Sequence, residues 1–279
     1  SWIKNNLEDT EIQKTVEKVK SQFGGTEILG KTIGIIGLGA IGIMLAKACH
    51  ALGMKVYGTK RNLESLKHEG LPEDMILVKT KEEMLSHCDY ISLNLPLSSD
   101  TKHMINKNTI EMMKDGVVIL NFARDQLVHD GDLNEALQTR KVHKYVTDFP
   151  NHQSANMEHV VAIPHLGAST EEAEDNCAIM AIHQIDQLMK HGHIINSVNY
   201  PEVSLPSRTG EMRLMILYHG HHQMMDIILP MVTHFNVLQS TERRNEQFGV
   251  ILIDFESKVS SSVIEDIQKI EGVTRIRSI

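Results

Sequence analysis

The sequence predicts an α/β protein with a doubly wound parallel sheet (Rossmann-like), followed by a small α+β domain. Short apolar runs alternate with helical patterns over about 165 residues, which is typical of parallel strands joined by crossover helices. A glycine-rich turn joins the first buried strand to a helix, and the pattern changes after an extended, proline-bounded segment at 199–206. We therefore expect a dinucleotide-binding domain at 1–198, a linker at 199–206 and a second domain at 207–279.

The composition is that of an ordinary globular protein, with 41% hydrophobic and 23% charged residues among 279. A net charge of −8 argues against a nucleic acid or an anionic membrane as partner, since both attract a basic face. The N-terminus is polar and predicts no signal peptide. The cysteines Cys49, Cys88 and Cys177 are far apart and lack a C-x-x-C spacing, which predicts buried free thiols in a reducing cytoplasm.

The first domain is expected to begin with an amphipathic helix at 10–23 that ends at Gly24 and Gly25. Little alternation within 117–122 predicts a strand with helices on both faces. The expected strands are at 31–36, 55–58, 75–78, 90–95, 117–122, 144–147 and 160–163. The expected helices among them are at 41–49, 81–87, 106–114 and 132–139.

A long helix is expected at 171–190. Ser169 and Glu172 have the spacing of a capping box, and Gly192 is placed to end the helix. Apolar residues recur along it at helical spacing and predict a buried stripe. The stripe consists of Cys177, Met180, Ala181, Ile185, Leu188 and Met189.

The second domain has a different order of elements. The expected strands are at 211–218, 237–240, 247–255 and 273–279, and the expected helices are at 224–234 and 263–270. This βαββαβ order in so short a segment is typical of a small α+β sandwich.

Three glycines, Gly37, Gly39 and Gly42, follow the first strand in G-x-G-x-x-G spacing. In a strand–turn–helix unit the first turns the chain, the second lets the backbone approach a pyrophosphate, and the third lets the helix pack on the strand. The phosphates would bind at the helix N-terminus beside Ala40 and Ile41, where free N–H groups and the positive end of the dipole point outward.

Several motifs together resemble the D-2-hydroxyacid dehydrogenase family in order and spacing. They are Ile33-Gly-Ile-Ile-Gly-Leu-Gly-Ala-Ile-Gly42, Asn94-Leu-Pro96, Asn121-Phe-Ala-Arg124 and Ile163-Pro-His-Leu-Gly-Ala-Ser-Thr170. Two further stretches look like D-3-phosphoglycerate dehydrogenases that carry a C-terminal ACT domain. These are Lys144-Tyr-Val-Thr-Asp-Phe-Pro-Asn151 and Ile270-Glu-Gly-Val-Thr-Arg-Ile-Arg277. The resemblance covers nearly the whole chain.

The resemblance implies roles for particular residues. Arg124 matches the substrate arginine, whose planar fork binds a carboxylate, and His165 matches the acid/base histidine that exchanges a proton with the C2 hydroxyl. Asp148 matches the aspartate that binds the nicotinamide carboxamide. Without the resemblance, Arg124 could instead be part of a surface ion pair, His165 could be a structural histidine, and Asp148 could belong to a turn. The remaining residues expected to line the cofactor are Asn94, Pro96, Thr101, Ala123 and Gly167.

Two departures from the family bear on catalysis and on the cofactor. In the family, a glutamate holds the catalytic histidine. The simplest register places Asn151 at the glutamate position, and the nearest acid is Glu158. We therefore expect His165 to be a weaker base, unless a shifted loop supplies the carboxylate. The second strand ends in Thr59, Lys60 and Arg61 instead of an acidic residue. A basic pair suits a 2′-phosphate, so NAD is expected from the resemblance and NADP from the local chemistry, unless both side chains are merely solvated.

A third departure concerns length, because the family's substrate domain is formed mainly by residues before the cofactor domain, and little precedes Lys31 here. The chain is expected to be either a fragment or a shortened protein whose catalysis is impaired or absent.

In the second domain, His219, His221 and His222 stand where serine-binding ACT domains carry a Pro-Gly loop, which makes amino-acid binding doubtful. Without nearby Cys or carboxylate ligands they predict solvated histidines and no metal site. Pairing of strand edges predicts a homo-oligomer, a dimer or a tetramer.

The predicted function is oxidation of a 2-hydroxy acid phosphate in the cytoplasm, from 3-phosphoglycerate to 3-phosphohydroxypyruvate in L-serine biosynthesis. Arg124 and His165 favour this enzyme. The missing glutamate and the short N-terminal part favour the alternative, a non-catalytic dinucleotide-binding and ACT-containing regulatory or assembly module.

Overall fold

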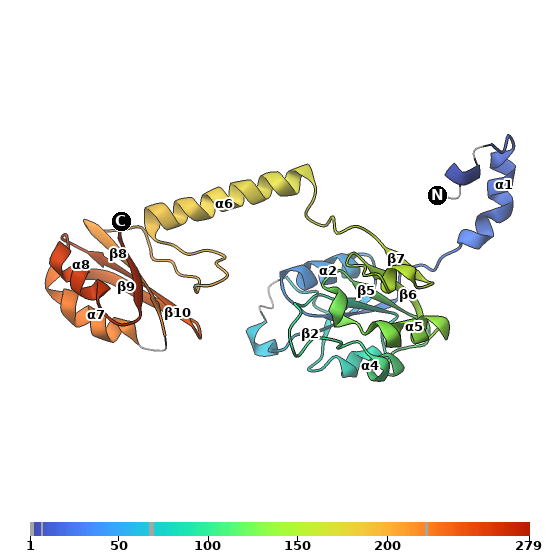
Figure 1. The fold of residues 1–279 in the computed structure, drawn as a ribbon, viewed down its shortest axis with the longest axis horizontal. Helices are drawn as coiled ribbons and strands as arrows, with labels where there is room; N and C mark the ends of the chain where they lie inside the picture. Colours follow the sequence, from blue (N-terminus) through green and yellow to red (C-terminus); the bar gives the residue numbers. More distant parts are fainter. Residues whose placement is uncertain (1–2, 7, 67–69, 221–222) are drawn as a thin grey trace. The chain divides into compact units, whose positions relative to one another are not determined.

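The computed structural model describes residues 3–6, 8–66, 70–220 and 223–279, which lie in two compact units, Ser1–Leu166 and Gly167–Ile279 (Figure 1). The sequence predicted the change of domain after residue 198. The division falls earlier because the end of the long helix contacts the small sheet: Arg277 donates from Nη2 to the carbonyl of Met189 at 2.9 Å. Within the described ranges, none of the helices combines the length and the apolar composition that crossing a bilayer requires.

The first unit is built on a seven-stranded parallel sheet with the order β3-β2-β1-β4-β5-β6-β7. This is the doubly wound order, in which the direction of strand addition reverses between β1 and β4. Each predicted strand is confirmed with small changes at its ends. The strands are β1 (Thr32–Ile36), β2 (Lys55–Thr59), β3 (Ile76–Leu77), β4 (Tyr90–Leu93), β5 (Val117–Asn121), β6 (Val142–Thr147) and β7 (Val160–Ala162).

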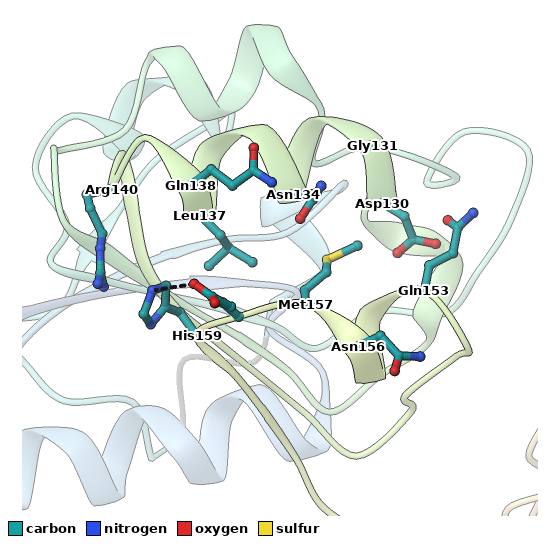
Figure 2. A pocket seen from close by; sticks show the side chains of 11 residues that line it. Asp130, Gly131, Asn134, Leu137, Gln138, Arg140, Gln153, Asn156, Met157 and His159 are labelled. Atoms are coloured by element: carbon teal, nitrogen blue, oxygen red, sulfur yellow. Dashed lines mark ion pairs between the residues drawn. The ribbon is translucent and has the colours of Figure 1, made fainter.

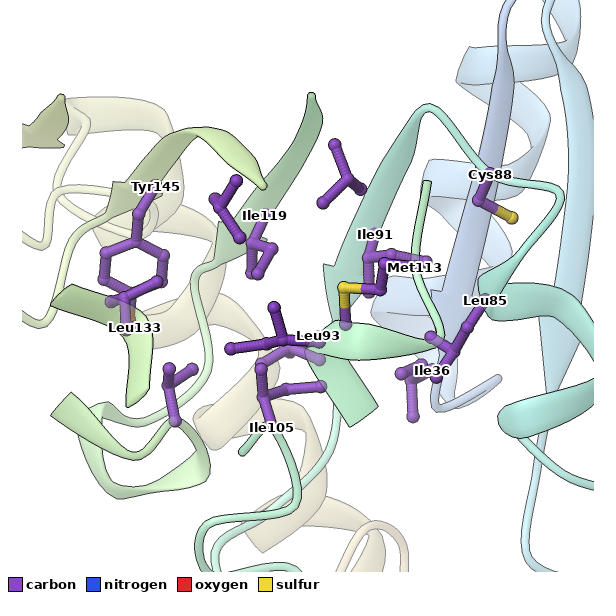
Figure 3. Packing of buried hydrophobic residues seen from close by; sticks show 14 of the residues in the cluster. Ile36, Leu85, Cys88, Ile91, Leu93, Ile105, Met113, Ile119, Leu133 and Tyr145 are labelled. Atoms are coloured by element: carbon purple, nitrogen blue, oxygen red, sulfur yellow. The ribbon is translucent and has the colours of Figure 1, made fainter. Parts of the chain in front are cut away.

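Helices cover the sheet in two groups. Ala46 and Cys49 of α2 pack with Ile33 and Ile35 of β1 on one face. Side chains of α3, α4 and α5 form a larger core on the other face with Ile36 and with β4 and β5, as Figure 3 shows for Leu85, Leu93, Ile119 and Leu133. The helices are α1 (Ile12–Val19), α2 (Ala40–Ala51), α3 (Glu82–Leu85), α4 (Lys107–Glu111) and α5 (Asp130–Gln138).

The second unit contains a four-stranded antiparallel sheet with the order β11-β8-β10-β9, which is the order 4-1-3-2 within the unit. The predicted βαββαβ order is confirmed. Buried residues of the two helices and of β8 and β10 form the core on one face. The elements are β8 (Met212–His219), α7 (Met224–Val232), β9 (Val237–Arg244), β10 (Phe248–Phe255), α8 (Ser261–Gln268) and β11 (Val273–Ser278).

The segment expected to be a linker at 199–206 packs on the opposite face of this sheet. Val203 and Leu205 are buried with Met215 and Leu252, and the backbones of Val203 and Ile194 exchange two hydrogen bonds. The segment is therefore part of the second unit's packing.

Three expectations about the long helix α6 (Glu171–His191) are wrong. Its N-cap is Thr170, whose hydroxyl accepts from the Ala173 amide at 3.1 Å, in place of Ser169. The predicted buried stripe is not formed, because none of its residues is buried; Met180, Ile185 and Met189 are more than half exposed. Cys177 is exposed for the same reason, whereas Cys49 and Cys88 are buried as predicted. Gly192 does end the helix, in the left-handed conformation.

Candidate functional site

The site lies at the carboxyl ends of β1 and β4, where a doubly wound sheet opens a crevice for a ligand. Strand β1 runs directly into the turn at Gly37, whose amide donates to the Thr59 carbonyl at 3.0 Å. The amide of Asn94, just beyond β4, donates to the Ile36 carbonyl at 2.8 Å. These bonds fix the two loops on either side of the crevice.

The three glycines of the turn meet different surroundings. Gly37 has φ +104°, and a Cβ there would lie 2.2 Å from the Asn94 carbonyl oxygen. A Cβ on Gly42 would lie 2.1 Å from the Gly37 carbonyl oxygen. A Cβ on Gly39 would meet nothing within 4 Å. Gly37 and Gly42 are therefore needed for the turn itself, whereas Gly39 faces open space in which a pyrophosphate would fit.

A groove follows the crevice in two adjoining cavities of about 630 and 590 Å3, which share Gly39, Asn94, Leu95 and Pro96. Together they have the size of a cofactor site. The residues predicted from the sequence that line the first are Gly37, Gly39, Lys60, Arg61, Asn94, Pro96 and Thr101. Those that line the second are Gly39, Ala40, Ile41, Asn94, Pro96, Ala123, Arg124 and His165.

Three predicted cofactor residues are placed differently. Asp148 lines neither of the two cavities. Gly42 packs behind the turn, on Gly37 and Ile35, and does not line either cavity. Gly167 belongs to the second compact unit, so its part in the groove stays a prediction.

The loop beyond β4 is held by its own hydrogen bonds. The Thr101 hydroxyl donates to the Pro96 carbonyl at 2.8 Å and accepts from the Ser98 amide at 2.7 Å. Asp100 on this loop forms an ion pair with Arg61 at 3.0 Å between exposed side chains. The Arg61 guanidinium, which lines the first cavity, is thus paired with a carboxylate that also lines it.

Arg124 is positioned by a buried side chain at the end of β5. The amide group of Asn121 donates to the Arg124 carbonyl at 2.8 Å and to the Tyr145 hydroxyl at 2.9 Å. Its oxygen accepts from the amide of Arg124 at 3.3 Å. Burial raises the pKa of Tyr145, although the bond with Asn121 acts in the opposite direction, so the phenol stays protonated at neutral pH.

His165 and Asp148 meet at the ends of the neighbouring strands β7 and β6. The imidazole Nδ1 lies 2.8 Å from Asp148 Oδ2. The Phe149 ring lies between the two candidate catalytic side chains: its centroid is 4.4 Å from that of His165 and 5.0 Å from the Arg124 guanidinium carbon. The structure therefore brings Arg124, His165 and Asp148 together.

The expectation that His165 lacks a carboxylate partner is wrong, because Asp148 provides one. Asn151, the residue in the glutamate position, donates from Nδ2 to Asp130 at 2.9 Å and accepts from the Ser154 amide at 2.8 Å. Glu158 is exposed, and its nearest basic group is His159, at 3.9 Å. Neither of these two residues forms a hydrogen bond with His165 among the described contacts.

The other oxygen of Asp148, Oδ1, is buried without a hydrogen-bond partner in the described part of the chain. An unsatisfied buried acceptor costs about 1–3 kcal/mol, and a donor from a bound ligand would remove this cost. Together with the open space at Gly39, this oxygen fits NAD, whose carboxamide carries N–H donors.

Sequence reasoning missed Asn121 and Phe149. Both stand inside the motifs that were used, Asn121-Phe-Ala-Arg124 and Asp148-Phe-Pro, so the signal was present in the sequence. Their contacts, however, depend on how β5, β6 and β7 align.

A larger cavity of about 760 Å3 lies away from this site, between α5 and the loop at 153–159 (Figure 2). Four amide side chains and two carboxylates contribute to its lining, and Arg140 and His159 lie at one end. None of the residues predicted for catalysis or cofactor binding lines it.

The histidine loop of the second unit is described only in part. His219 is exposed, whereas His221 and His222 lie outside the described residues. Among the residues that are described, no group of three or more His, Cys, Asp or Glu side chains could hold a metal ion.

Comparison with known proteins agrees with the geometry of the site. Residues 3–167 match the model of the D-isomer specific 2-hydroxyacid dehydrogenase family, NAD binding domain. A D-3-phosphoglycerate dehydrogenase of Haemophilus influenzae is 29% identical over 92% of this chain and 65% of its own length. The enzyme of that name from Bacillus subtilis is 34% identical over 68% of this chain and 37% of its own length. The chain thus spans less than two thirds of the length of these relatives.

Solved structures share the fold. A glyoxylate reductase from Paecilomyes thermophila superposes with a TM-score of 0.57 and 30% identity, over 66% of this chain and 58% of that one. A D-isomer specific 2-hydroxyacid dehydrogenase from Lactobacillus delbrueckii in complex with NAD superposes with a TM-score of 0.56 and 25% identity, over 63% of this chain and 58% of that one. The family model covers more than half of the chain and ends just after His165. The chain therefore belongs to the D-isomer-specific 2-hydroxyacid dehydrogenase family and contains its NAD-binding domain.

Proposed function

We propose that this protein is an oxidoreductase that transfers hydride between NAD and a D-2-hydroxy acid. The observation that carries the proposal is the meeting of Arg124, His165 and Asp148 around the Phe149 ring, beside the dinucleotide groove. Oxidation of a 2-hydroxy acid needs a cation for the carboxylate and a base for the hydroxyl proton, and Arg124 and His165 supply these two groups.

His165 acts as the base in oxidation and as the acid in reduction. Asp148 engages Nδ1, so Nε2 is the atom that takes the proton from the C2 hydroxyl and later returns it. Arg124 binds the carboxylate with its planar fork, and its stacking over Phe149 restricts the positions that the guanidinium can take. Bound NAD supplies the hydride acceptor.

The proposed substrate pair is 3-phosphoglycerate and 3-phosphohydroxypyruvate, in the synthesis of L-serine. The names of the curated relatives and their match over up to 92% of the chain support this choice. Other 2-hydroxy acids and their 2-oxo acids would use the same arginine and histidine, so glyoxylate, a 2-oxo acid, is the comparison substrate for reduction.

The choice between NAD and NADP rests on the end of β2. Lys60 and Arg61 would suit a 2′-phosphate, but the Arg61 guanidinium forms an ion pair with Asp100. A 2′-phosphate would have to compete with this carboxylate, so we favour NAD as cofactor.

The test is reduction of 3-phosphohydroxypyruvate by the whole chain with NADH and, separately, with NADPH. We expect turnover with NADH, a fall in kcat of about 100-fold or more in His165→Gln, and mainly a raised KM in Arg124→Gln. Measurable NADH binding without any turnover would overturn the enzyme and support the alternative, a non-catalytic dinucleotide-binding regulatory or assembly module.

Around this core we propose a cytoplasmic protein whose second domain, at 207–279, is an ACT-like regulatory domain, and which assembles as a dimer or a tetramer. The strand order of the small sheet supports the ACT-like assignment, and its two edge strands, β9 and β11, support the assembly. Light scattering of the purified protein measures the oligomeric state, and a monomer at all concentrations would contradict the assembly.

A further inference from the structure

The polar cavity between α5 and the loop at 153–159 is a second candidate site in the first unit (Figure 2). Asp130, Asn134 and Gln138 lie four residues apart along α5 and therefore share the helix face that lines the cavity. The volume of about 760 Å3 is in the range of small-molecule sites. Among the described residues, this cavity and the dinucleotide groove have no lining residue in common.

The two walls of the cavity are held together by the protein itself. Asn151 donates from Nδ2 to Asp130, at the start of α5, at 2.9 Å, and its Oδ1 accepts from the Ser154 amide in the loop at 2.8 Å. Leu137 of the helix is buried in the core of the first unit, and Met157 of the loop packs against the same core. A cavity that is formed in advance loses little order when a ligand binds.

Two residues with positive φ lie at one end of the cavity. Arg140 has φ +62° and His159 has φ +65°. Arg140 directly follows Thr139, the C-cap of α5, at a position where glycine is usual because it adopts this conformation without strain. Residues with such backbone strain are concentrated at functional sites, so Arg140 is a candidate ligand-binding residue.

The Arg140 guanidinium is an exposed cation, and within the described parts of the chain it forms no hydrogen bond or ion pair. His159, at the same end, is 3.9 Å from the exposed carboxylate of Glu158, and an exposed pair of this kind contributes little. The planar fork of an arginine binds a carboxylate with two parallel hydrogen bonds. Because Glu158 and Asp130 also line the cavity, a ligand with one negative charge is favoured over a dianion.

Amide side chains supply most of the remaining polar groups. Those of Asn134, Gln138 and Gln153 form no hydrogen bond with the described residues. Asn156 donates from Nδ2 to the His152 carbonyl at 2.7 Å, which leaves its oxygen as an acceptor. An amide group both donates and accepts, and so does a hydroxyl group, so these side chains suit a ligand with several hydroxyl groups.

We propose that this cavity binds a small sugar acid, a monocarboxylate that carries several hydroxyl groups. Arg140 binds the carboxylate at one end of the cavity. The amides of Asn134, Gln138 and Gln153 bind the hydroxyl groups along its length. The site does not depend on the proposed reaction, which uses the groove and Arg124.

NMR of the whole chain tests the site with D-glucuronate as probe. In the cyclic form of this sugar acid, the carbon beside the carboxylate carries the ring oxygen and no hydroxyl group, so the probe is not a 2-hydroxy acid. The methyl signal of Met157, which lines the cavity, reports binding and is assigned by its absence in Met157→Leu. We expect a saturable shift of this signal with a Kd on the order of 1 mM, because one ion pair and a few hydrogen bonds hold the probe.

Two matched probes separate the carboxylate from the hydroxyl groups. Glucose has the ring and its hydroxyl groups without the carboxylate, and cyclohexanecarboxylate has a ring and the carboxylate without the hydroxyl groups. Each should bind about tenfold more weakly than glucuronate or worse, because each lacks one set of contacts. Equal affinity for glucose would overturn the role of Arg140, and equal affinity for cyclohexanecarboxylate would overturn the role of the amides.

Arg140→Gly separates the ligand contact from the stability of the fold. Glycine adopts the positive φ without strain, so this variant should unfold at the wild-type temperature or above it, yet bind glucuronate about tenfold more weakly or worse. Arg140→Gln should lose the same affinity. Arg124→Gln, which removes an arginine of the groove, is the control and should leave glucuronate binding unchanged. Wild-type affinity in either Arg140 variant, weaker binding in Arg124→Gln, or no saturable shift in wild type would overturn the proposal.

Discussion

Gly37 and Gly39 lie two residues apart, yet a methyl group would have opposite consequences at the two positions. At Gly37 it would meet the backbone of Asn94 in a conformation with positive φ, whereas at Gly39 it would enter the open groove. The requirement for glycine therefore comes from folding at Gly37, where the protein's own backbone leaves no room for a Cβ, and from ligand binding at Gly39.

We therefore expect Gly37→Ala to lower the free energy of unfolding by about 1–3 kcal/mol or more, since a non-glycine residue is strained there. Gly39→Ala should unfold at the wild-type temperature but bind NADH about tenfold more weakly, because the methyl group occupies space for the pyrophosphate. Calorimetry and fluorescence titration measure the two effects. Wild-type NADH affinity in Gly39→Ala would show that the pyrophosphate does not lie over this residue.

At the scale of elements, two carboxylates that do not line the groove connect neighbouring strands. Asp89, at the start of β4, accepts from the Thr32 amide at 2.8 Å and from Lys114 Nζ at 3.0 Å. In the small sheet, Asp254 of β10 pairs with Arg213 of β8, and both side chains are fully buried. The Asp89 pair is partly exposed and the Asp254 pair is not, so their contributions to the free energy of unfolding should differ strongly.

Burial raises the pKa of Asp89, but the bonds from Thr32 and Lys114 outweigh this effect and leave it lowered. A lowered carboxyl pKa stabilises the fold above the unfolded pKa, and this contribution is lost as the pH falls through the folded value. Asp89→Asn should cost no more than about 1 kcal/mol at pH 7, and the difference from wild type should shrink as the pH falls below the unfolded pKa of about 4 and through the lower folded value. Urea unfolding at several pH values checks this; a difference that does not shrink between about pH 5 and pH 3 would contradict it.

Asp254→Asn leaves the Arg213 cation buried without a charged partner, although the arginine still donates to the carbonyls of His191 and Pro206. We expect a loss of about 3–5 kcal/mol in the free energy of unfolding of the second unit. The exposed pair of Lys269 and Asp266 is the control, and Asp266→Asn should cost less than about 1 kcal/mol. Similar losses in both variants would show that the buried ion pair stabilises the fold no more than the exposed one.

The sequence predicted the elements well where the pattern is local. Strand β5 and the turn at Gly37 are determined by apolar runs and glycine spacing, and both occur as expected. The exposure of α6 could not be predicted, because helical spacing says which residues share a face but not whether anything covers that face. The pairing of His165 with Asp148 could not be predicted either, since it depends on the register between β6 and β7.

At the scale of the whole molecule, the chain consists of two units with separate cores. Ile119 and Leu133 belong to the core of the first, and Ile253 and Ile228 to that of the second. The groove lies entirely within the first unit, and so do Arg124 and His165. A ligand of the groove should therefore stabilise the first unit directly.

We expect thermal unfolding of the whole chain to show two transitions, of which NADH raises only the one that belongs to the first unit. At a concentration of 100 times Kd the ligand adds about 2.7 kcal/mol to the stability of the state that binds it. Calorimetry with and without NADH measures the shift, and Asp254→Asn identifies the other transition because it lowers the stability of the second unit alone. A single transition that moves as a whole with NADH would show that the two units unfold as one, and would contradict the division between Leu166 and Gly167 as an energetic boundary.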